Sequence, residues 1–241
     1  MQFDPRTVAR DIPGVLEEVF PQLTPGVVAQ FNGSARTLPV VPLSEALLAQ
    51  STMQRAMLFE LGCVVGERIL ETGSDIDWPR CFAETIRRQR LYFDAKLPRQ
   101  LDPVDQMLAE TVGVNLAAAL SEISFESGLP IDTRPHIPGL EWIASGYGDF
   151  ALGTTLVEVK CTSKRFSSPD YRQVAIYWLL SYAASIEGRG NEWRNLVLFN
   201  PRSGEKVSMT FDTFLTTIGG GRTKVDLLQL FKTLVGSRQV R

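Results

Sequence analysis

Histidine and cysteine are scarce in this chain of 241 residues, and their scarcity excludes several kinds of site. His136 is the only histidine, so a catalytic centre built on paired histidines is excluded and no zinc site is apparent. Two prolines flank this histidine, and we expect it to cap or pack a turn. The cysteines Cys63, Cys81 and Cys161 are widely scattered, which agrees with a reducing environment. We expect Cys63 and Cys161, which lie in apolar runs, to be buried packing residues.

Long apolar runs and a strong excess of one charge are also missing. No stretch approaches the length of a membrane span, and residues 1–14 carry four charged residues without an apolar core. We therefore expect no signal peptide, no membrane partner and a cytoplasmic location. The formal net charge is −2, unlike that of proteins that hold nucleic acid through bulk electrostatics. Any binding of nucleic acid must then be local, transient or shared with a partner protein.

What is present points to a folded chain with two kinds of region. The hydrophobic fraction of 44% is enough to bury a sizeable core. Six prolines within residues 1–43 predict an extended arm with one short helical turn near residues 15–20. Apolar spacing and start signals then predict three helices, over residues 44–73, from Asp77 toward Lys96, and from Asp102 to Gly128. We expect a helical N-terminal region with this arm over residues 1–100, and a second domain over residues 101–241.

The second of these helices carries a basic and aromatic stretch. It could follow a phosphate backbone, or it could be an ordinary solvated charged face. Its members are Arg87, Arg88, Arg90, Leu91, Tyr92, Phe93, Lys96 and Arg99.

Two carboxylates and a lysine surround an expected β-hairpin in the second domain. Residues 155–161 alternate in a β-branched run, so the side chains of Glu158 and Lys160 should point to one face and the apolar ones to the other. A short strand over residues 150–152 and a turn at residues 153–155 should fold Asp149 back toward Glu158. This places both carboxylates where they could hold one hard cation.

Such a site suits phosphodiester hydrolysis. Oxygen ligands favour Mg²⁺ or Mn²⁺, which lowers the pKa of a bound water and stabilises negative charge on the phosphoryl oxygens. The main-chain carbonyl of Val159 is a third candidate ligand beside Asp149 and Glu158. Lys160 could orient or deprotonate the attacking water, or stabilise the phosphate, and the sequence leaves these roles open.

A helix and a hairpin should follow the site. Ser168 and Pro169 read as the helix start, and Gln173 and Tyr177 lie four residues apart on one face, where they could hydrogen-bond a phosphate or base and stack against it. Residues 195–199 and 206–211 predict two strands with a turn at residues 203–204, before a last helix near residues 225–235.

Together, Gly146-x-x-Asp149, Glu158-x-Lys160 and Gln173-x-x-x-Tyr177 resemble, in this order and spacing, the motifs of the PD-(D/E)xK nuclease superfamily. The resemblance is to its RecB-like and lambda-exonuclease-like branch and covers roughly residues 113–210. It implies an α/β fold with a restriction-endonuclease-like core, a central mixed sheet flanked by helices. It also implies that Asp149 and Glu158 bind Mg²⁺ or Mn²⁺, that Lys160 is the catalytic lysine, and that Gln173 and Tyr177 contact nucleic acid or support the site. The expected substrate is DNA, with RNA also open.

The chain departs from this pattern upstream of the hairpin. Many members of the branch carry a His or Glu on the preceding helix, whereas this chain has Asn115 at the matching position. Glu122 or Glu110 could substitute for it, or both could be ordinary solvated carboxylates of the helix. The iron–sulfur members use four cysteines, and three scattered ones argue against a cluster.

We expect a metal-dependent deoxyribonuclease that cuts phosphodiester bonds. It could act as part of a defence or repair complex, with other protein partners or as a homo-oligomer. The alternative is an inactive subunit with the same fold that binds nucleic acid or a protein partner.

Overall fold

The computed structural model describes residues 2–12, 14–90 and 95–238, which form an α/β structure around a six-stranded mixed sheet. The order is β1-β8-β7-β6-β5-β2, and only β6 and β7 run parallel. A separate two-stranded ribbon pairs β3 with β4. The strands are β1 (Arg36–Thr37), β2 (Asp132–Thr133), β3 (His136–Ile137), β4 (Gly146–Tyr147), β5 (Phe150–Leu152), β6 (Thr155–Val159), β7 (Asn195–Phe199) and β8 (Glu205–Thr210).

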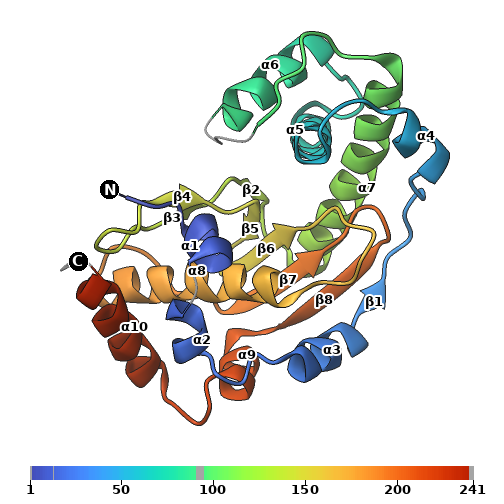
Figure 1. Cartoon of the computed structure of the whole chain (residues 1–241). Coiled ribbons are helices and arrows are strands. Elements are labelled where there is room, and N and C mark those ends of the chain that lie inside the picture. Colours follow the sequence, from blue (N-terminus) through green and yellow to red (C-terminus); the bar gives the residue numbers. More distant parts are fainter. Residues whose placement is uncertain (1, 13, 91–94, 239–241) are drawn as a thin grey trace.

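Long helices cover both faces of the sheet (Figure 1). On one face, α7 (Pro103–Ser127) packs Leu116 and Leu120 against Val157 and Val159 of β6. On the other, α8 (Ser168–Ile186) packs against the β6 residue Leu156. The alternation of side chains along β6 therefore separates two apolar layers, and the expected mixed sheet flanked by helices is confirmed.

Both long helices begin at signals that the sequence carries, and α7 also ends at one. Pro103 opens α7, and Gly128 ends it in the left-handed region at φ 65°. The N-cap of α8 is Ser167, one residue earlier than expected, and it forms a capping box with Asp170.

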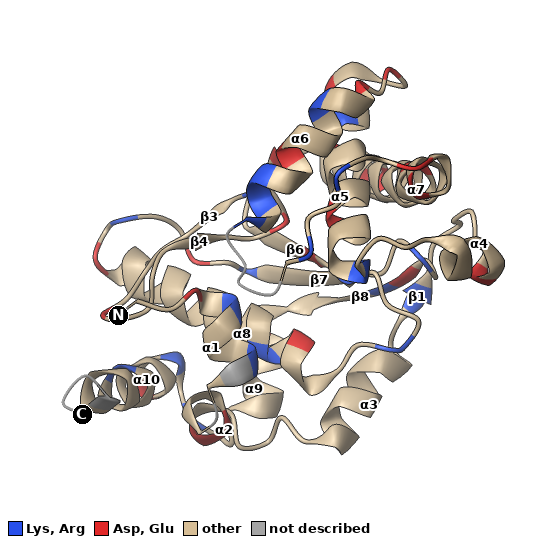
Figure 2. Ribbon diagram, turned by 45° about the horizontal axis from the view of Figure 1, so that its top comes forward, with Lys and Arg blue, Asp and Glu red and all other residues tan. Residues whose placement is uncertain are grey.

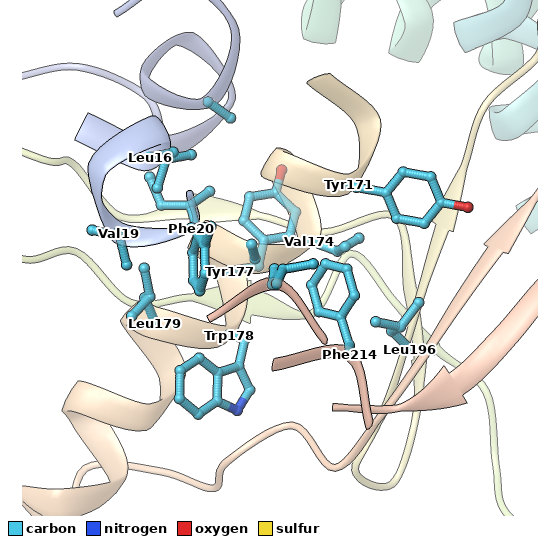
Figure 3. Packing of buried hydrophobic residues seen from close by; sticks show 14 of the residues in the cluster. Leu16, Val19, Phe20, Tyr171, Val174, Tyr177, Trp178, Leu179, Leu196 and Phe214 are labelled. Carbon is cyan, nitrogen blue, oxygen red and sulfur yellow. The ribbon is translucent and has the colours of Figure 1, made fainter. Parts of the chain in front are cut away.

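The N-terminal arm was expected to be extended with one short helical turn near residues 15–20. The helical turn is confirmed, but the extended chain before and after it was wrong, because two further helices form there. The arm forms α1 (Pro5–Asp11), α2 (Val15–Val19) and α3 (Pro25–Gly33). Pro5 and Pro25 each begin a helix, because the missing N–H of proline costs nothing in a first helical turn. Leu16, Val19 and Phe20 of this arm pack with residues of α8 in one core (Figure 3). The arm is therefore part of the hydrophobic core that α8 forms on its face of the sheet.

The helical region above the sheet has a core of its own. Instead of one helix over residues 44–73, it has α4 (Glu45–Gln50) and α5 (Arg55–Thr72), separated at residues 51–54. There Ser51 Oγ donates a hydrogen bond to Asp105 at 2.6 Å, which ties the break to α7. The next helix, α6 (Trp78–Gln89), ends before Lys96, and Leu91, Tyr92 and Phe93 lie outside the described residues.

The C-terminal elements close the fold. The hairpin of β7 and β8 is confirmed, with Gly204 at φ 75° in its turn. The sequence did not predict α9 (Phe211–Ile218), whereas α10 (Lys224–Arg238) corresponds to the expected last helix. The division at residue 100 stays a prediction, although α7 contributes to both the helical core and the sheet. No helix within residues 2–12, 14–90 and 95–238 is long and apolar enough to cross a membrane.

Candidate active site

The β5–β6 hairpin brings Asp149 against the end of β6, as the sequence predicted. Phe150 pairs with Val157, and Gly153 makes the turn at φ 58°. Asp149 directly precedes β5, and its Oδ2 accepts a hydrogen bond of 2.8 Å from the Val159 main-chain nitrogen. The carboxylate is thereby fixed next to the residue that follows Glu158.

Glu158 and Lys160 lie together, as the strand alternation required. Lys160 Nζ is 2.8 Å from Glu158 Oε1, and the Lys160 main-chain nitrogen extends the sheet to Phe199 O at 2.9 Å. Glu158 has no exposed surface, and the Lys160 side chain is 12% exposed. An ion pair this deeply buried depends on further hydrogen bonds to hold its position.

Gln173 and Tyr177 supply those bonds from α8. Gln173 Oε1 accepts from Lys160 Nζ at 3.0 Å, and its Nε2 donates to Glu158 Oε1 and, at 3.0 Å, to Tyr177 Oη. Each of the two residues has only 1% of its surface exposed. In this arrangement they support the site, and their burial leaves no exposed ring for a base to stack on.

Arg6 completes the cluster and was not anticipated from the sequence. Its Nη2 lies 2.9 Å from Asp149 Oδ1, and its Nε donates to Tyr177 Oη at 3.0 Å. A Cβ on Gly146 would lie 3.2 Å from Pro5 Cδ, so the glycine allows α1 to lie close to β4. The contact between Arg6 and Asp149 joins residues 143 positions apart in the sequence, and no local motif in the arm predicts it.

The two carboxyl groups titrate in opposite directions. Burial and the neighbouring Asp149 carboxylate raise the pKa of Glu158 to about 7. Burial would also raise the pKa of Asp149, but the charges of Arg6 and Lys160 outweigh it and lower this pKa below its usual value. Asp149 is therefore ionised at neutral pH, whereas Glu158 is near the midpoint of its titration.

One structural observation indicates that Asp149, Glu158 and the Val159 carbonyl are suited to bind a divalent cation. Glu158 Oε2 is buried and has no hydrogen-bond partner among the described residues. Such an atom is costly unless a proton or cation compensates it. The Val159 carbonyl should point to the same side of the strand as the Val159 N–H that binds Asp149, as in any β-strand. The described chain has no group of three or more His, Cys, Asp or Glu side chains arranged for a metal, so this set relies on two carboxylates and a main-chain oxygen.

A cavity of about 180 Å³ opens beside Asp149 and is lined from the helical region by Glu60, Glu67 and Arg88. Glu60 and Glu67 lie about two turns apart on α5, so both side chains project from the same face of this helix. Burial raises the pKa of Glu67. These carboxylates are the acidic residues that the sequence reasoning missed.

The upstream candidates on α7 lie elsewhere. Glu110 and Glu122 are exposed and do not line this cavity. Asn115 is buried, accepts from the Val41 nitrogen at 2.8 Å, and donates to Val41 O and Pro201 O, both at 2.8 Å. Its role in this structure is to join the arm to the β7–β8 turn, because its amide satisfies main-chain groups of both.

Two arginines of the basic stretch, Arg87 and Arg88, are neutralised by carboxylates. Arg88 is buried in ion pairs with Glu60, Glu67 and Glu84, and Arg87 pairs with Glu84. Basic and acidic segments alternate along α6 (Figure 2). Arg90, Lys96 and Arg99 are exposed, so a nucleic-acid surface here stays a prediction.

The remaining candidates from composition differ in part from expectation. His136 does not pack a turn but is exposed on β3. Cys63 and Cys161 pack against hydrophobic cores, as expected, but are only partly buried, while Cys81 is buried; all three are free thiols. Comparisons of this chain with protein-family models, curated proteins and solved structures found no match.

Proposed function

We propose that this chain is a metal-dependent nuclease of the PD-(D/E)xK type with a restriction-endonuclease-like core, in the RecB-like and lambda-exonuclease-like branch. The observation that carries the proposal is the buried Glu158 carboxylate, which has one oxygen without a partner in the described chain and lies beside Asp149 and Lys160. The order of elements also supports it. Helix α7, the β5–β6 hairpin, α8 and the parallel strand β7 follow one another as the resemblance implies.

Each residue then has a defined task. Asp149, Glu158 and the Val159 carbonyl would hold Mg²⁺ or Mn²⁺, which supplies Lewis-acid stabilisation of the phosphoryl oxygens and a more acidic water. Lys160 keeps Glu158 in place and presents N–H donors toward the negative charge of the reacting phosphate. Gln173 and Tyr177 hold the glutamate and lysine in position from α8. The proposed substrate is DNA.

The test is DNA cleavage with Mg²⁺ or Mn²⁺ by the full chain. Lys160→Ala should lower the rate at least about 100-fold, the usual effect of losing a group that acts on the proton or charge of the reaction. Lys232→Ala is the matched control, because Lys232 lies on α10 and pairs only weakly with Glu187, at 3.6 Å. Circular dichroism should show both variants folded. Equal cleavage by wild type and Lys160→Ala would overturn the proposal.

A second candidate function is supported by the ion pairs themselves. Arg6 pairs with Asp149, and Lys160 pairs with Glu158, so two cationic side chains already compensate the carboxylates. A site of this kind can be a structural element of a module that binds nucleic acid or a protein partner without cutting. Calorimetric titration with Mn²⁺ separates the two functions. The nuclease should take up Mn²⁺ and lose this uptake in Asp149→Asn, whereas the binding module should show no uptake that depends on Asp149.

A third arrangement, a nuclease active only within a defence or repair complex, makes a separate prediction. The purified chain should bind Mn²⁺ through Asp149 yet cut DNA only after partner proteins are added.

A further inference from the structure

An exposed aromatic ring stands next to the candidate metal ligands. Tyr147 lies on β4, two residues before Asp149, and keeps 51% of its surface exposed. The Arg134 guanidinium lies 4.9 Å from the centre of its ring. His136, its partner across the β3–β4 ribbon, meets the ring edge-on at 6.1 Å. The ring is therefore held in a defined position while half of the residue faces solvent.

The main chain ties this ring to the site. The Arg134 nitrogen donates to the Asp149 carbonyl at 2.9 Å, and the Gly148 nitrogen donates to the Pro135 carbonyl at 2.9 Å. Arg134 itself has a left-handed backbone with φ 57°, a conformation that costs energy for a residue with a side chain and persists where the surrounding contacts impose it. Arg134, Tyr147 and Asp149 all line the cavity of about 180 Å³.

The charges around this cavity are unevenly compensated. Arg88 is paired with Glu60 and Glu67, and Arg6 is paired with Asp149. Arg134 forms no ion pair within residues 2–12, 14–90 and 95–238. Its guanidinium lies in the cavity wall against the exposed ring. It interacts electrostatically with Glu67, but no carboxylate of the described chain forms an ion pair with it, so its N–H donors can bind a ligand.

We propose that Tyr147 and Arg134 form a subsite for one unpaired nucleotide, in which the tyrosine ring stacks on the base and the guanidinium binds the adjacent phosphate. An aromatic face accepts any base, but only a base that is not stacked within a duplex can reach it. Arginine binds phosphate oxygens through paired N–H donors. His136 acts as a positioning residue for the ring.

The role of this subsite rests on the proposed function, since the subsite would position a single-stranded end next to Asp149 and Glu158. It also fits the net charge of −2, because a local stacking contact replaces a broad basic surface.

The experiment measures binding without cleavage. Fluorescence anisotropy of a short labelled deoxythymidine oligonucleotide is recorded with the full chain in EDTA. Tyr147→Ala should weaken binding at least about fivefold, the lower end for a stacked base, whereas Tyr147→Phe should bind like wild type because stacking uses the ring and not the hydroxyl. Arg134→Ala should weaken binding and make it less dependent on salt, and Arg134→Lys should restore part of both.

Phe125→Ala is the matched control, because Phe125 is 91% exposed on α7 and does not line the cavity, so its loss should change nothing. A blunt duplex of the same length should bind more weakly than the single strand and should not respond to Tyr147→Ala. Failure of wild type to bind the oligonucleotide, or equal binding by wild type and Tyr147→Ala, would overturn the subsite.

The two proposals fail separately. Oligonucleotide binding that depends on Tyr147 in a protein that never cleaves DNA would support the subsite and reject the nuclease. Cleavage that depends on Lys160, with a KM unchanged in Tyr147→Ala, would support the nuclease and reject the subsite. Lys232→Ala should keep the wild-type affinity in EDTA, since Lys232 lies on α10 and does not line this cavity.

Discussion

Two networks of buried charge lie near the same cavity, and they are satisfied to different degrees. In the first, Arg88 of α6 meets three carboxylates, with Nη2 2.6 Å from Glu67, Nε 2.7 Å from Glu84 and Nη1 3.2 Å from Glu60. All of these carboxylates belong to α5 or α6, and no buried oxygen of theirs lacks a partner within the described chain. In the second network, at the end of β6, the Glu158 Oε2 atom does lack one.

The difference separates a structural network from one that can accept a ligand. The Arg88 network holds two helices together, and each of its N–H groups that faces a carboxylate is already used. The β6 network contains the deeply buried Glu158 carboxylate, and its raised pKa indicates that the negative charge is incompletely compensated. Proteins retain such a group against its cost where function requires it. The comparison can be tested by disturbing each network in turn.

The largest effect is expected from Arg88→Met. This change keeps most of the buried volume but leaves three carboxylates without their shared cation, and it should lower the free energy of unfolding by about 3 kcal/mol. The lower end of the usual range applies because the side chains of Glu60, Glu67 and Glu84 are 12–28% exposed and can gain water. Urea unfolding followed by circular dichroism measures the loss.

Arg87→Met is the control for this prediction, since Arg87 is exposed and pairs with the same Glu84. It should change stability very little. Mn²⁺ uptake should survive in Arg88→Met if the network is structural. Loss of uptake together with unchanged stability would reverse the roles given to the two networks.

An effect of at most similar size, with a characteristic pH dependence, is expected from Glu158→Gln. The pKa of Glu158 is raised from 4.5 to about 7 on folding, so the native state binds an extra proton between these values. The free energy of unfolding of the metal-free protein should therefore fall as pH rises through this window, by up to about 3 kcal/mol. The glutamine variant should lose that slope and be more stable than wild type above pH 7.

The measurement is urea unfolding in EDTA below and above this window. The raised pKa of Glu67 acts in the same direction, so the slope should flatten without vanishing. The lowered pKa of Asp149 acts only at more acidic pH. Glu110→Gln, which changes an exposed carboxylate on α7, is the matched control and should keep the wild-type slope. An unchanged slope in Glu158→Gln would show that Glu158 is already compensated.

Local signals in the sequence predicted the hairpin and its charged pair. Alternation along β6 placed Glu158 and Lys160 on one side, and Gly153 supplied the turn that returns Asp149. Gly128 and Gly204 likewise mark the end of α7 and the β7–β8 turn. These features follow from backbone rules that act over a few residues, and for this reason the sequence alone was sufficient.

The missed features depend on packing between distant segments. The Arg6 contact with Asp149 exists only because α1 packs on α8 through Val8 and Ala9. Glu60 on α5 lies on a polar helix face that α6 covers with an arginine, and helical spacing cannot distinguish such a face from a solvated one. The break between α4 and α5 is likewise held by a side chain of α7.

The smallest effect, and the most direct test of the second network, is expected from Arg6→Met. The guanidinium of Arg6, 2.9 Å from Asp149, competes with any divalent cation for that carboxylate. Its removal should strengthen Mn²⁺ binding by roughly tenfold, equivalent to about 1.4 kcal/mol. Arg10→Met is the matched control, because Arg10 lies on the same helix but pairs with Asp170 at 3.3 Å. Calorimetric titration with Mn²⁺ should separate the two variants. Weaker binding in Arg6→Met would mean that Arg6 holds Asp149 in its ligand position and does not compete with the cation. The arginine would then be a structural part of the β6 network, as Arg88 is of the Arg88 network.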